Sequence, residues 1–440
     1  MEASSSGGTV DLLSIYDSHY TRDLVLTHLQ SGSIFWGSTS IIDTSYFSNC
    51  TQLRQLDLGA VILNADISNL LYAVSTQLRI LSLEETSWVN NDNADKMADM
   101  LCIFTQLESI NLRSAMFSIE NIVHLPVTLR QIDISHAHHF SETAMVSFLR
   151  RHPRLESFSA SPCPVMNQDI MDALSDLPNL TNLTLGFIDD RTIDMSCLSR
   201  LTGIRSLTLQ SVSSLNESSL LPILSSLTSL STLSLRRCDR VFDYSSLSFC
   251  TLLSSLTITD TMQLCDTDLI LLSARCSLRH LHISNCINAT SQGLCYALSH
   301  SQLQEFLITH CPSITDEVMY TLVTTQETIR EISIERCIGI TSKGVGALAW
   351  LRNIRALRKL DICKNRQIDD SAVESLHNAL LTLARRPQPF LSASDTDCHR
   401  SRKRRERSPA KEQTLTLLVA QTSVTQCVES KVRDYIHLIY

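Results

Sequence analysis

The sequence predicts an α/β solenoid of horseshoe form, with short parallel strands on the concave face and helices on the convex face. A six-residue apolar pattern returns thirteen times at a near-constant spacing of about 25 residues. Each copy alternates apolar and polar residues, as a half-buried strand does. A helix-like apolar spacing follows each copy before the next one begins. One strand–turn–helix unit is therefore expected to repeat along the chain.

The composition is that of a folded protein. Apolar residues make up 43% of the 440 residues and charged residues 19%, so there is enough apolar surface for a core. The net charge of −8 gives no electrostatic reason to expect nucleic acid or an anionic membrane as partner. The start lacks the layout of a signal peptide, and fifteen cysteines without a CxxC pair predict reduced thiols. We expect a cytoplasmic or nuclear protein without a cofactor.

The repeated pattern is Leu-x-x-Leu-x-Leu, in which Ile, Phe or Ala sometimes replaces a leucine. Its first positions are Leu53, Leu78, Leu107, Leu129, Leu155, Leu180, Ile204, Leu230, Leu253, Leu278, Leu303, Ile329 and Leu357. One unit cannot bury its leucines alone, whereas stacking places each unit against its neighbours. The pattern thus predicts a curved array with its parallel strands on one side.

A cysteine or asparagine recurs three residues after the last apolar strand position. The set consists of Cys163, Cys238, Cys286, Cys311, Cys337 and Asn365. A small buried donor at this point can satisfy backbone groups where the chain turns toward the convex side. The segments 314–318 and 340–345 then place Thr, Asp or Ser ahead of a helical spacing, which predicts capped helices.

The runs 281–286, 311–316 and 337–341 resemble the cysteine-containing class of leucine-rich repeat. That class is typical of F-box and leucine-rich-repeat substrate receptors of SCF-type ubiquitin ligases. It also occurs in antagonist-of-mitotic-exit-network proteins, which resemble those receptors without the F-box. The resemblance covers residues 31–386. It implies a protein-binding adaptor or substrate-recognition component, with ubiquitin-ligase subunits among its partners. The alternative is a structural scaffold in a cytoskeletal or ciliary assembly.

The two ends differ from the array. We predict a helical cap over residues 1–30, an array of about 13–14 repeats over 31–386, and a basic, disordered tail over 387–440. A degenerate strand at 34–36 and a half-repeat at 42–50 would leave little room upstream for an F-box.

The tail contains one concentrated basic run, made of Arg402, Lys403, Arg404 and Arg405. It is a candidate nuclear-import signal. The alternative is an ordinary solvated tail, since such runs are common in disordered ends.

The sequence offers few candidates for a catalytic or metal-binding site. The sequence His136-Ala137-His138-His139 offers imidazoles, but few other ligands are near and we expect no metal there. The chain has no Gly-rich phosphate loop, GxSxG elbow or HExxH pair. Burial explains the turn cysteines more simply than catalysis. We therefore predict that the protein is not an enzyme.

The strand residues between the leucines should point into the concavity and form the binding surface. The most distinctive side chains lie in the C-terminal third of the array. The predicted protein-binding residues are His282, Leu307, Glu335, Arg358, Lys359, Asp361 and Arg236. For any single residue the alternative is an ordinary solvated strand face. We expect a protein partner there, neither nucleic acid nor membrane, and a monomer outside the complex.

Overall fold

The computed structural model describes residues 101–384 and 414–440, with gaps at 116–118, 138–140, 164 and 434. Shorter described stretches are 23–25, 53–58, 62–63, 71–72, 74–85 and 87–88. The chain divides into two compact units, Met1–Phe242 and Asp243–Tyr440. We refer to them as the N-terminal unit and the C-terminal unit.

The N-terminal unit is built on a parallel sheet with the strand order β1-β2-β4-β6-β7-β8-β9-β10-β11. Its strands are β1 (Asp23–Val25), β2 (Gln55–Asp57), β4 (Ile80–Ser82), β6 (Ser109–Asn111), β7 (Gln131–Asp133), β8 (Ser157–Ala160), β9 (Asn182–Ile188), β10 (Ser206–Val212) and β11 (Thr232–Arg236). A small second sheet pairs β3 (Ile62–Leu63) with β5 (Ser87–Trp88). The helices of this unit are η4 (Glu120–His124), α3 (Glu142–Arg151), α4 (Gln168–Ser175), η5 (Met195–Arg200) and α5 (Glu217–Ser226), where η denotes a 3₁₀-helix.

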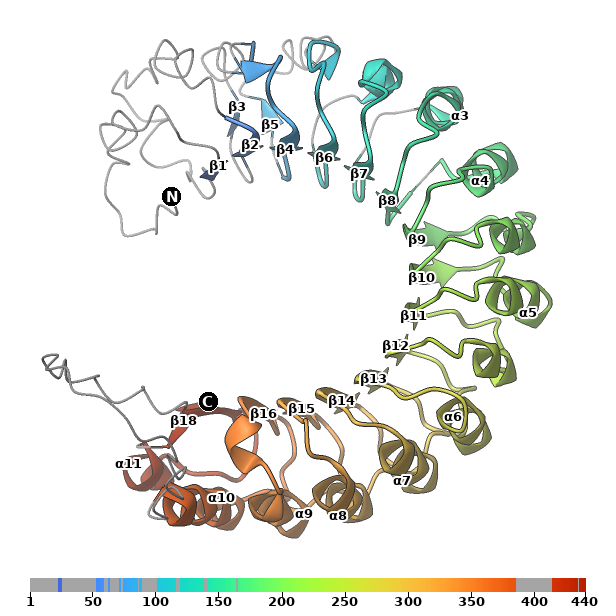
Figure 1. Ribbon diagram of the computed structural model, residues 1–440. Helices are drawn as coiled ribbons and strands as arrows, with labels where there is room; N and C mark the ends of the chain where they lie inside the picture. Colours follow the sequence, from blue (N-terminus) through green and yellow to red (C-terminus); the bar gives the residue numbers. More distant parts are fainter. Residues whose placement is uncertain are drawn as a thin grey trace, which may run out of the picture. The chain divides into compact units, whose positions relative to one another are not determined.

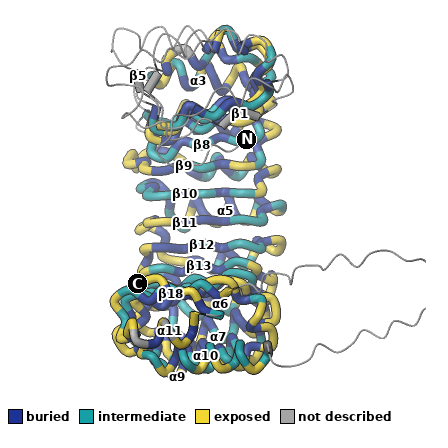
Figure 2. The backbone as a smooth tube through the Cα atoms, turned by 90° about the vertical axis from the view of Figure 1, so that its left-hand side faces the viewer, coloured by how far each residue is buried: buried dark blue, intermediate teal, exposed yellow. Residues whose placement is uncertain are grey.

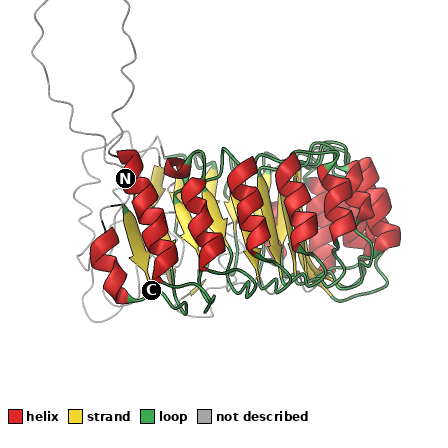
Figure 3. Cartoon of the chain, turned by 90° about the horizontal axis from the view of Figure 1, so that it is seen from below, coloured by secondary structure: helices red, strands yellow, loops and turns green. Residues whose placement is uncertain are grey.

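The C-terminal unit repeats this design in the strand order β12 to β18, and each strand is parallel to the next (Figure 1). Its strands are β12 (Ser255–Thr259), β13 (His280–Ser284), β14 (Glu305–Thr309), β15 (Glu331–Ser333), β16 (Lys359–Asp361), β17 (Leu415–Leu418) and β18 (Ile436–Ile439). Its helices are η6 (Ser245–Phe249), α6 (Asp266–Ser273), α7 (Ser291–His300), α8 (Asp316–Thr325), α9 (Ser342–Ala347), η7 (Leu348–Trp350), η8 (Ile354–Ala356), α10 (Asp370–Ala384), η9 (Gln426–Val428) and α11 (Glu429–Val432). Within this unit the helices form one layer and the strands another (Figure 3).

The strand register follows the apolar pattern. Leu281 and Ile283 of β13 are buried, whereas His282 between them is only half-buried. The same alternation of buried and less buried residues runs along β14, β15, β16, β17 and β18 (Figure 2). A slip of one residue would turn every leucine to solvent, so the pattern fixes which side of each strand faces the helices. The predicted solenoid with concave strands and convex helices is confirmed in each unit.

A sharp turn ends each strand, and its geometry is shared between repeats. The residue two positions after the last apolar strand residue has a positive φ, for example 53° at Asn285 and 54° at His310. The next residue is the recurrent cysteine, which turns inward. The Sγ atom of Cys286 donates to the carbonyl oxygens of Ile258 (3.7 Å) and Ser284 (3.3 Å). The predicted donor role of the turn cysteines is therefore confirmed at this position.

The helices of the C-terminal unit are linked to one another through their N-termini. Thr341, the N-cap of α9, donates its backbone N–H (2.8 Å) and its hydroxyl (2.6 Å) to the carboxylate of Asp316 in α8. Thr290 makes the same two bonds to Asp266, at 2.7 and 2.5 Å. One carboxylate thus stabilises the start of its own helix and holds the cap of the next repeat.

Both chain ends depart from the prediction. Residues 23–25, placed by the sequence in a helical cap, form β1, which pairs with β2. Residues 414–440, predicted to be a disordered tail, form β17, η9, α11 and β18. β17 pairs with β16 and β18 with β17, so the sheet continues for two more strands. Their buried leucines and valines give these strands the same inward face as earlier repeats.

Several predicted features lie outside the described residues. They are the strand at 34–36, the half-repeat at 42–50, His138, His139 and the basic run Arg402, Lys403, Arg404 and Arg405. Among the described residues, no helix is both long and apolar enough to cross a membrane.

Candidate functional site

The concave face of the C-terminal unit presents three parallel rows of side chains, because each strand offers every second residue to that side. The central row contains the fifth residue of each repeat pattern. Strand pairing places these residues in the order Thr257, His282, Leu307, Ser333, Asp361, Leu418 and Ile439. Neighbours in a row are about 4.8 Å apart across the sheet, so one partner can contact several repeats at once.

Four of the predicted residues come together in this unit. His282 and Leu307 are direct partners of adjacent strands, and Asp361 lies two strands farther along the same row. Glu335 follows β15 and forms an ion pair with Lys364. The strand register therefore places the predicted apolar side chain and the predicted charged residues on neighbouring strands of one face.

The other predicted residues are less central. Lys359 stands on β16 in an outer row, beside Glu331 of β15. Arg358 precedes that strand and is exposed. Arg236 belongs to β11 of the N-terminal unit, where its Nε donates to the Ser234 hydroxyl. We therefore restrict the candidate site to residues of the C-terminal unit.

Only Lys359 of one outer row was predicted from the sequence. The third position gives His280, Glu305, Glu331 and Lys359 on four successive strands. The His280 Nε2 lies 3.9 Å from Glu305 Oε1. Two carboxylates thus lie side by side between a histidine and a lysine. Reading the third position of the same motif would have found this row.

The site is also longer than predicted, because β17 and β18 extend it. Leu418 of β17 is the row neighbour of Asp361, and Ile439 follows on β18. Ile439 is 42% exposed and Tyr440 is 44% exposed. Exposed apolar groups therefore lie beside the charged residues on this side of the site.

Counted over these rows, the concave face is acidic. Its carboxylates are Glu305, Glu331, Glu335 and Asp361, against Lys359, and Lys364 beyond the end of β16 pairs with Glu335. The Asp361 carboxylate accepts the backbone N–H of Cys363 (3.0 Å), which orients it at the strand end. A partner that binds here should present basic groups around an apolar side chain.

Three cysteines at the strand ends are poorly suited to nucleophilic chemistry. Burial raises the pKa of the Cys286 thiol to about 12 and that of Cys238 to about 11. At the concave face, burial and then the neighbouring Asp361 carboxylate raise the pKa of Cys363 to about 11. These groups are thiols near neutral pH, whereas the thiolate is the reactive form. Among the described residues, no cluster of three or more His, Cys, Asp or Glu could hold a metal ion.

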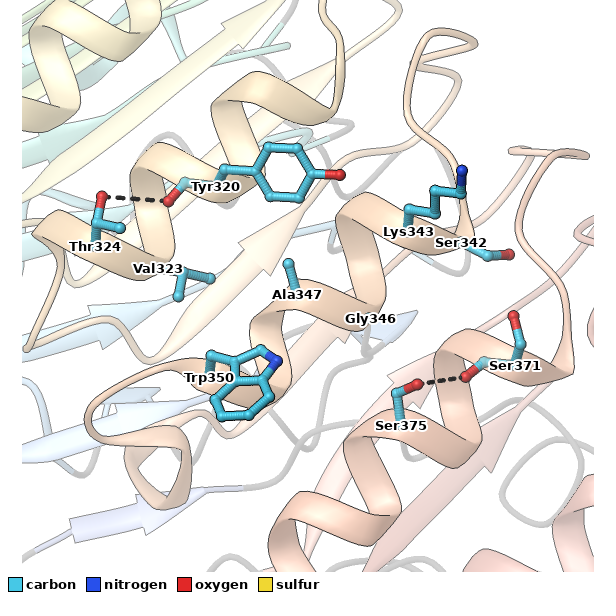
Figure 4. A pocket seen from close by; sticks show the side chains of 10 residues that line it. All are labelled: Tyr320, Val323, Thr324, Ser342, Lys343, Gly346, Ala347, Trp350, Ser371 and Ser375. Carbon is cyan, nitrogen blue, oxygen red and sulfur yellow. Dashed lines mark hydrogen bonds between the residues drawn. The ribbon is translucent and has the colours of Figure 1, made fainter.

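A second surface feature lies on the convex side of the C-terminal unit. A hollow runs across α8, α9 and α10, with Tyr320, Trp350 and Ser375 among its lining residues (Figure 4). Trp350 is 81% exposed. Lys343 supplies the single charged side chain among the residues that line the hollow. It therefore offers few groups that could orient a partner, and the concave face is the stronger candidate.

No protein-family model matches the sequence, and no curated protein matches it. Solved structures show similar folds. A chain of the Rad7 and Elc1 complex in yeast has 17% identity and a TM-score of 0.48, with 80% of this chain and 88% of that chain covered. An internalin from Listeria monocytogenes has 13% identity and a TM-score of 0.35, with 90% and 88% covered. A leucine-rich-repeat protein of Leptospira interrogans has 12% identity and a TM-score of 0.37, with 96% and 90% covered.

Because these identities and TM-scores are low, the fold is assigned from this chain's own repeats and structure. The sequence contains thirteen copies of one leucine pattern, and the structure contains the stacked parallel strands, convex helices and buried turn cysteines that this pattern predicts. The chain is a leucine-rich-repeat solenoid with buried cysteines at several of its turns.

Proposed function

We propose that this chain is a non-enzymatic adaptor that binds a partner protein through the concave face of its C-terminal unit. The observation that carries the proposal is the row from His282 to Ile439, which sets apolar and charged side chains on six parallel strands. Hydrogen bonding within the sheet holds these side chains before a partner arrives, so little ordering is needed on binding. The acidic balance of the rows favours a basic partner surface with a central apolar side chain.

We further propose that the adaptor recognises substrates in an SCF-type ubiquitin-ligase pathway, in the cytoplasm or nucleus. This step is supported by the resemblance of its repeats to the cysteine-containing class of those receptors, and therefore by analogy. The test is native affinity purification of the tagged chain. A Skp-like linker or a cullin should be recovered. Recovery of neither, together with fixed localisation on a filament, would favour the scaffold instead.

The concave surface itself is tested by the double variant Leu307→Asp with His282→Ala. It should weaken binding of the recovered partner by at least about 1–2 kcal/mol, because it removes an apolar contact and puts a charged group where the partner's apolar side chain would be buried. Far-UV circular dichroism and melting should remain close to wild type.

The matched control changes charges on the convex side, at Glu317 and Lys343, both of which are exposed. This pair should have much less effect on partner binding. If the convex pair is the damaging one and the concave pair is silent, the site assignment is wrong.

A further inference from the structure

The turns that end the strands of the C-terminal unit stack into a rim with two rows of side chains. The first row consists of the residues with positive φ, which are Asp260, Asn285, His310, Arg336, Lys364 and Gln421. The second row lies two residues later and begins with Met262, Ile287, Pro312, Ile338 and Arg366. Met262 is 62% exposed, Ile287 41% and Ile338 61%. A polar row and an apolar row therefore run side by side along one edge of the unit.

A hollow of about 590 Å³ lies along these rows and is lined by His310, Pro312, Arg336, Ile338, Lys364 and Arg366, among others. We call it the rim groove. Its lining contains three cationic side chains and no carboxylate. Lys364 is paired with Glu335, but among the described residues neither Arg336 nor Arg366 forms an ion pair. The rim groove is thus basic, in contrast to the acidic concave face.

The groove is held rigidly by contacts between successive turns. Asn288 Nδ2 donates to the Met262 carbonyl (2.5 Å), and the Ser313 hydroxyl donates to the Ile287 carbonyl (3.1 Å). At the next turn Gly339 lies directly against the Ile314 carbonyl, where an added Cβ could not be accommodated. The Arg336 guanidinium donates to His310 Nε2 (3.2 Å), which also fixes that side chain. A ligand would meet a preformed surface.

We propose that the rim groove binds an extended acidic segment of a partner protein, with apolar side chains seated on the Ile287–Pro312–Ile338 row. Charge complementarity favours an acidic ligand, because among the described residues no carboxylate forms an ion pair with Arg336 or Arg366. Exposed isoleucines beside them favour a peptide over a purely ionic ligand. Single-stranded nucleic acid is the weaker fit, since no Phe, Tyr or Trp side chain lines the groove for base stacking. The groove meets the concave site at the Lys364–Glu335 ion pair but is lined by other residues, so each proposal is tested by its own variants.

The test uses the full chain and a short fluorescein-labelled peptide of glutamate pairs separated by single leucines, titrated by fluorescence anisotropy at low salt. The peptide should bind the wild type, and added salt should weaken it. Arg336→Glu together with Arg366→Glu should weaken binding at least about tenfold. Ile338→Ser should also weaken it, and peptides with glutamine for glutamate or serine for leucine should bind worse.

The matched control is Lys343→Glu together with Arg355→Glu, which makes the same change in net charge at exposed positions away from the groove. It should retain peptide binding, as should the concave pair Leu307→Asp with His282→Ala. No binding to the wild type, or equal loss in the rim and control variants, would overturn the proposal. So would preferential binding of a single-stranded RNA, or self-association of the chain abolished by the rim variant, which would assign the groove to a second copy.

Discussion

Replacement of Gly344 by alanine tests whether contacts between repeats outweigh local helix preference. Gly344 lies inside α9, where alanine should stabilise an isolated helix by about 1 kcal/mol. In the folded chain, however, a Cβ at this position would stand 2.7 Å from Asp316 Cγ and closer still to its Oδ1. The Asp316 carboxylate would have to move away from the helix.

The expected cost follows from the bonds that this movement breaks. Asp316 accepts two hydrogen bonds from Thr341, at 2.8 and 2.6 Å. A hydrogen bond to a charged group is worth about 1.5–3 kcal/mol, and the partial exposure of Asp316 favours the lower value because water replaces the lost partner. Losing both bonds costs about 3 kcal/mol, and the gain in helix preference offsets about 1 kcal/mol. We expect Gly344→Ala to destabilise the chain by about 2 kcal/mol.

The assay is urea unfolding followed by circular dichroism, with midpoints compared because a repeat array need not unfold in one step. Gly346→Ala is the matched control in the same helix, since its added Cβ would lie 3.6 Å from Ser375 Cβ in ordinary contact. That variant should be at least as stable as wild type. In an Asp316→Ala background, the penalty of Gly344→Ala should disappear. Equal midpoints for the two glycine variants would refute the reasoning.

Two further predictions concern the core of each unit. Leu281→Ala removes a side chain that is 1% exposed and should lower the free energy of unfolding by about 2–5 kcal/mol. Leu271→Ala, at a leucine that is 42% exposed, should lower it by less than about 1 kcal/mol. Equal melting of the two variants would mean that the strand register is wrong. In the N-terminal unit, burial lowers the pKa of His152 below 6.5, with backbone carbonyls of Phe148 and Leu125 partly opposing the shift. The unfolded chain therefore binds the proton more readily, so the stability of the folded chain should fall as the pH drops below 6.5. His152→Gln should make this decline shallower in melting curves recorded from pH 7 to 5. An unchanged slope would contradict the assignment.

The sequence predicted the strand register well because the physical constraint is local. Leu307 and Ile308 are adjacent and both apolar, yet their places in the pattern put the first in the concave row and the second in the core. The helix caps were predictable for the same reason, since Thr341 needs only its own helix start to be recognised. Their links to the previous repeat, such as the Thr341–Asp316 pair, depend on stacking and were not foreseen.

The last two strands escaped the sequence reading for two identifiable reasons. Thr414 stands where the pattern requires its first leucine, and it follows Leu357 by more than twice the usual repeat length. The pairing of Leu360 with Leu417 shows that the sheet resumes in register after this interval. Periodicity cannot detect a repeat displaced by an insertion. The exposure of Trp350 was equally hidden, because convex side chains obey no strict pattern.

The acidic concave face and the basic rim groove of the C-terminal unit meet at the turn after β15. Glu335 belongs to the acidic concave face, and the next residue, Arg336, lines the basic rim groove. The positive φ of 53° at Arg336 bends the chain there, so consecutive side chains serve different surfaces. Lys364 joins the two through its ion pair with Glu335. A partner with a basic patch followed by an acidic segment could therefore contact both surfaces at once. For such a partner, each contact raises the effective concentration of the other. The rim and concave variants combined should therefore weaken binding more than the rim variant or the concave variant alone.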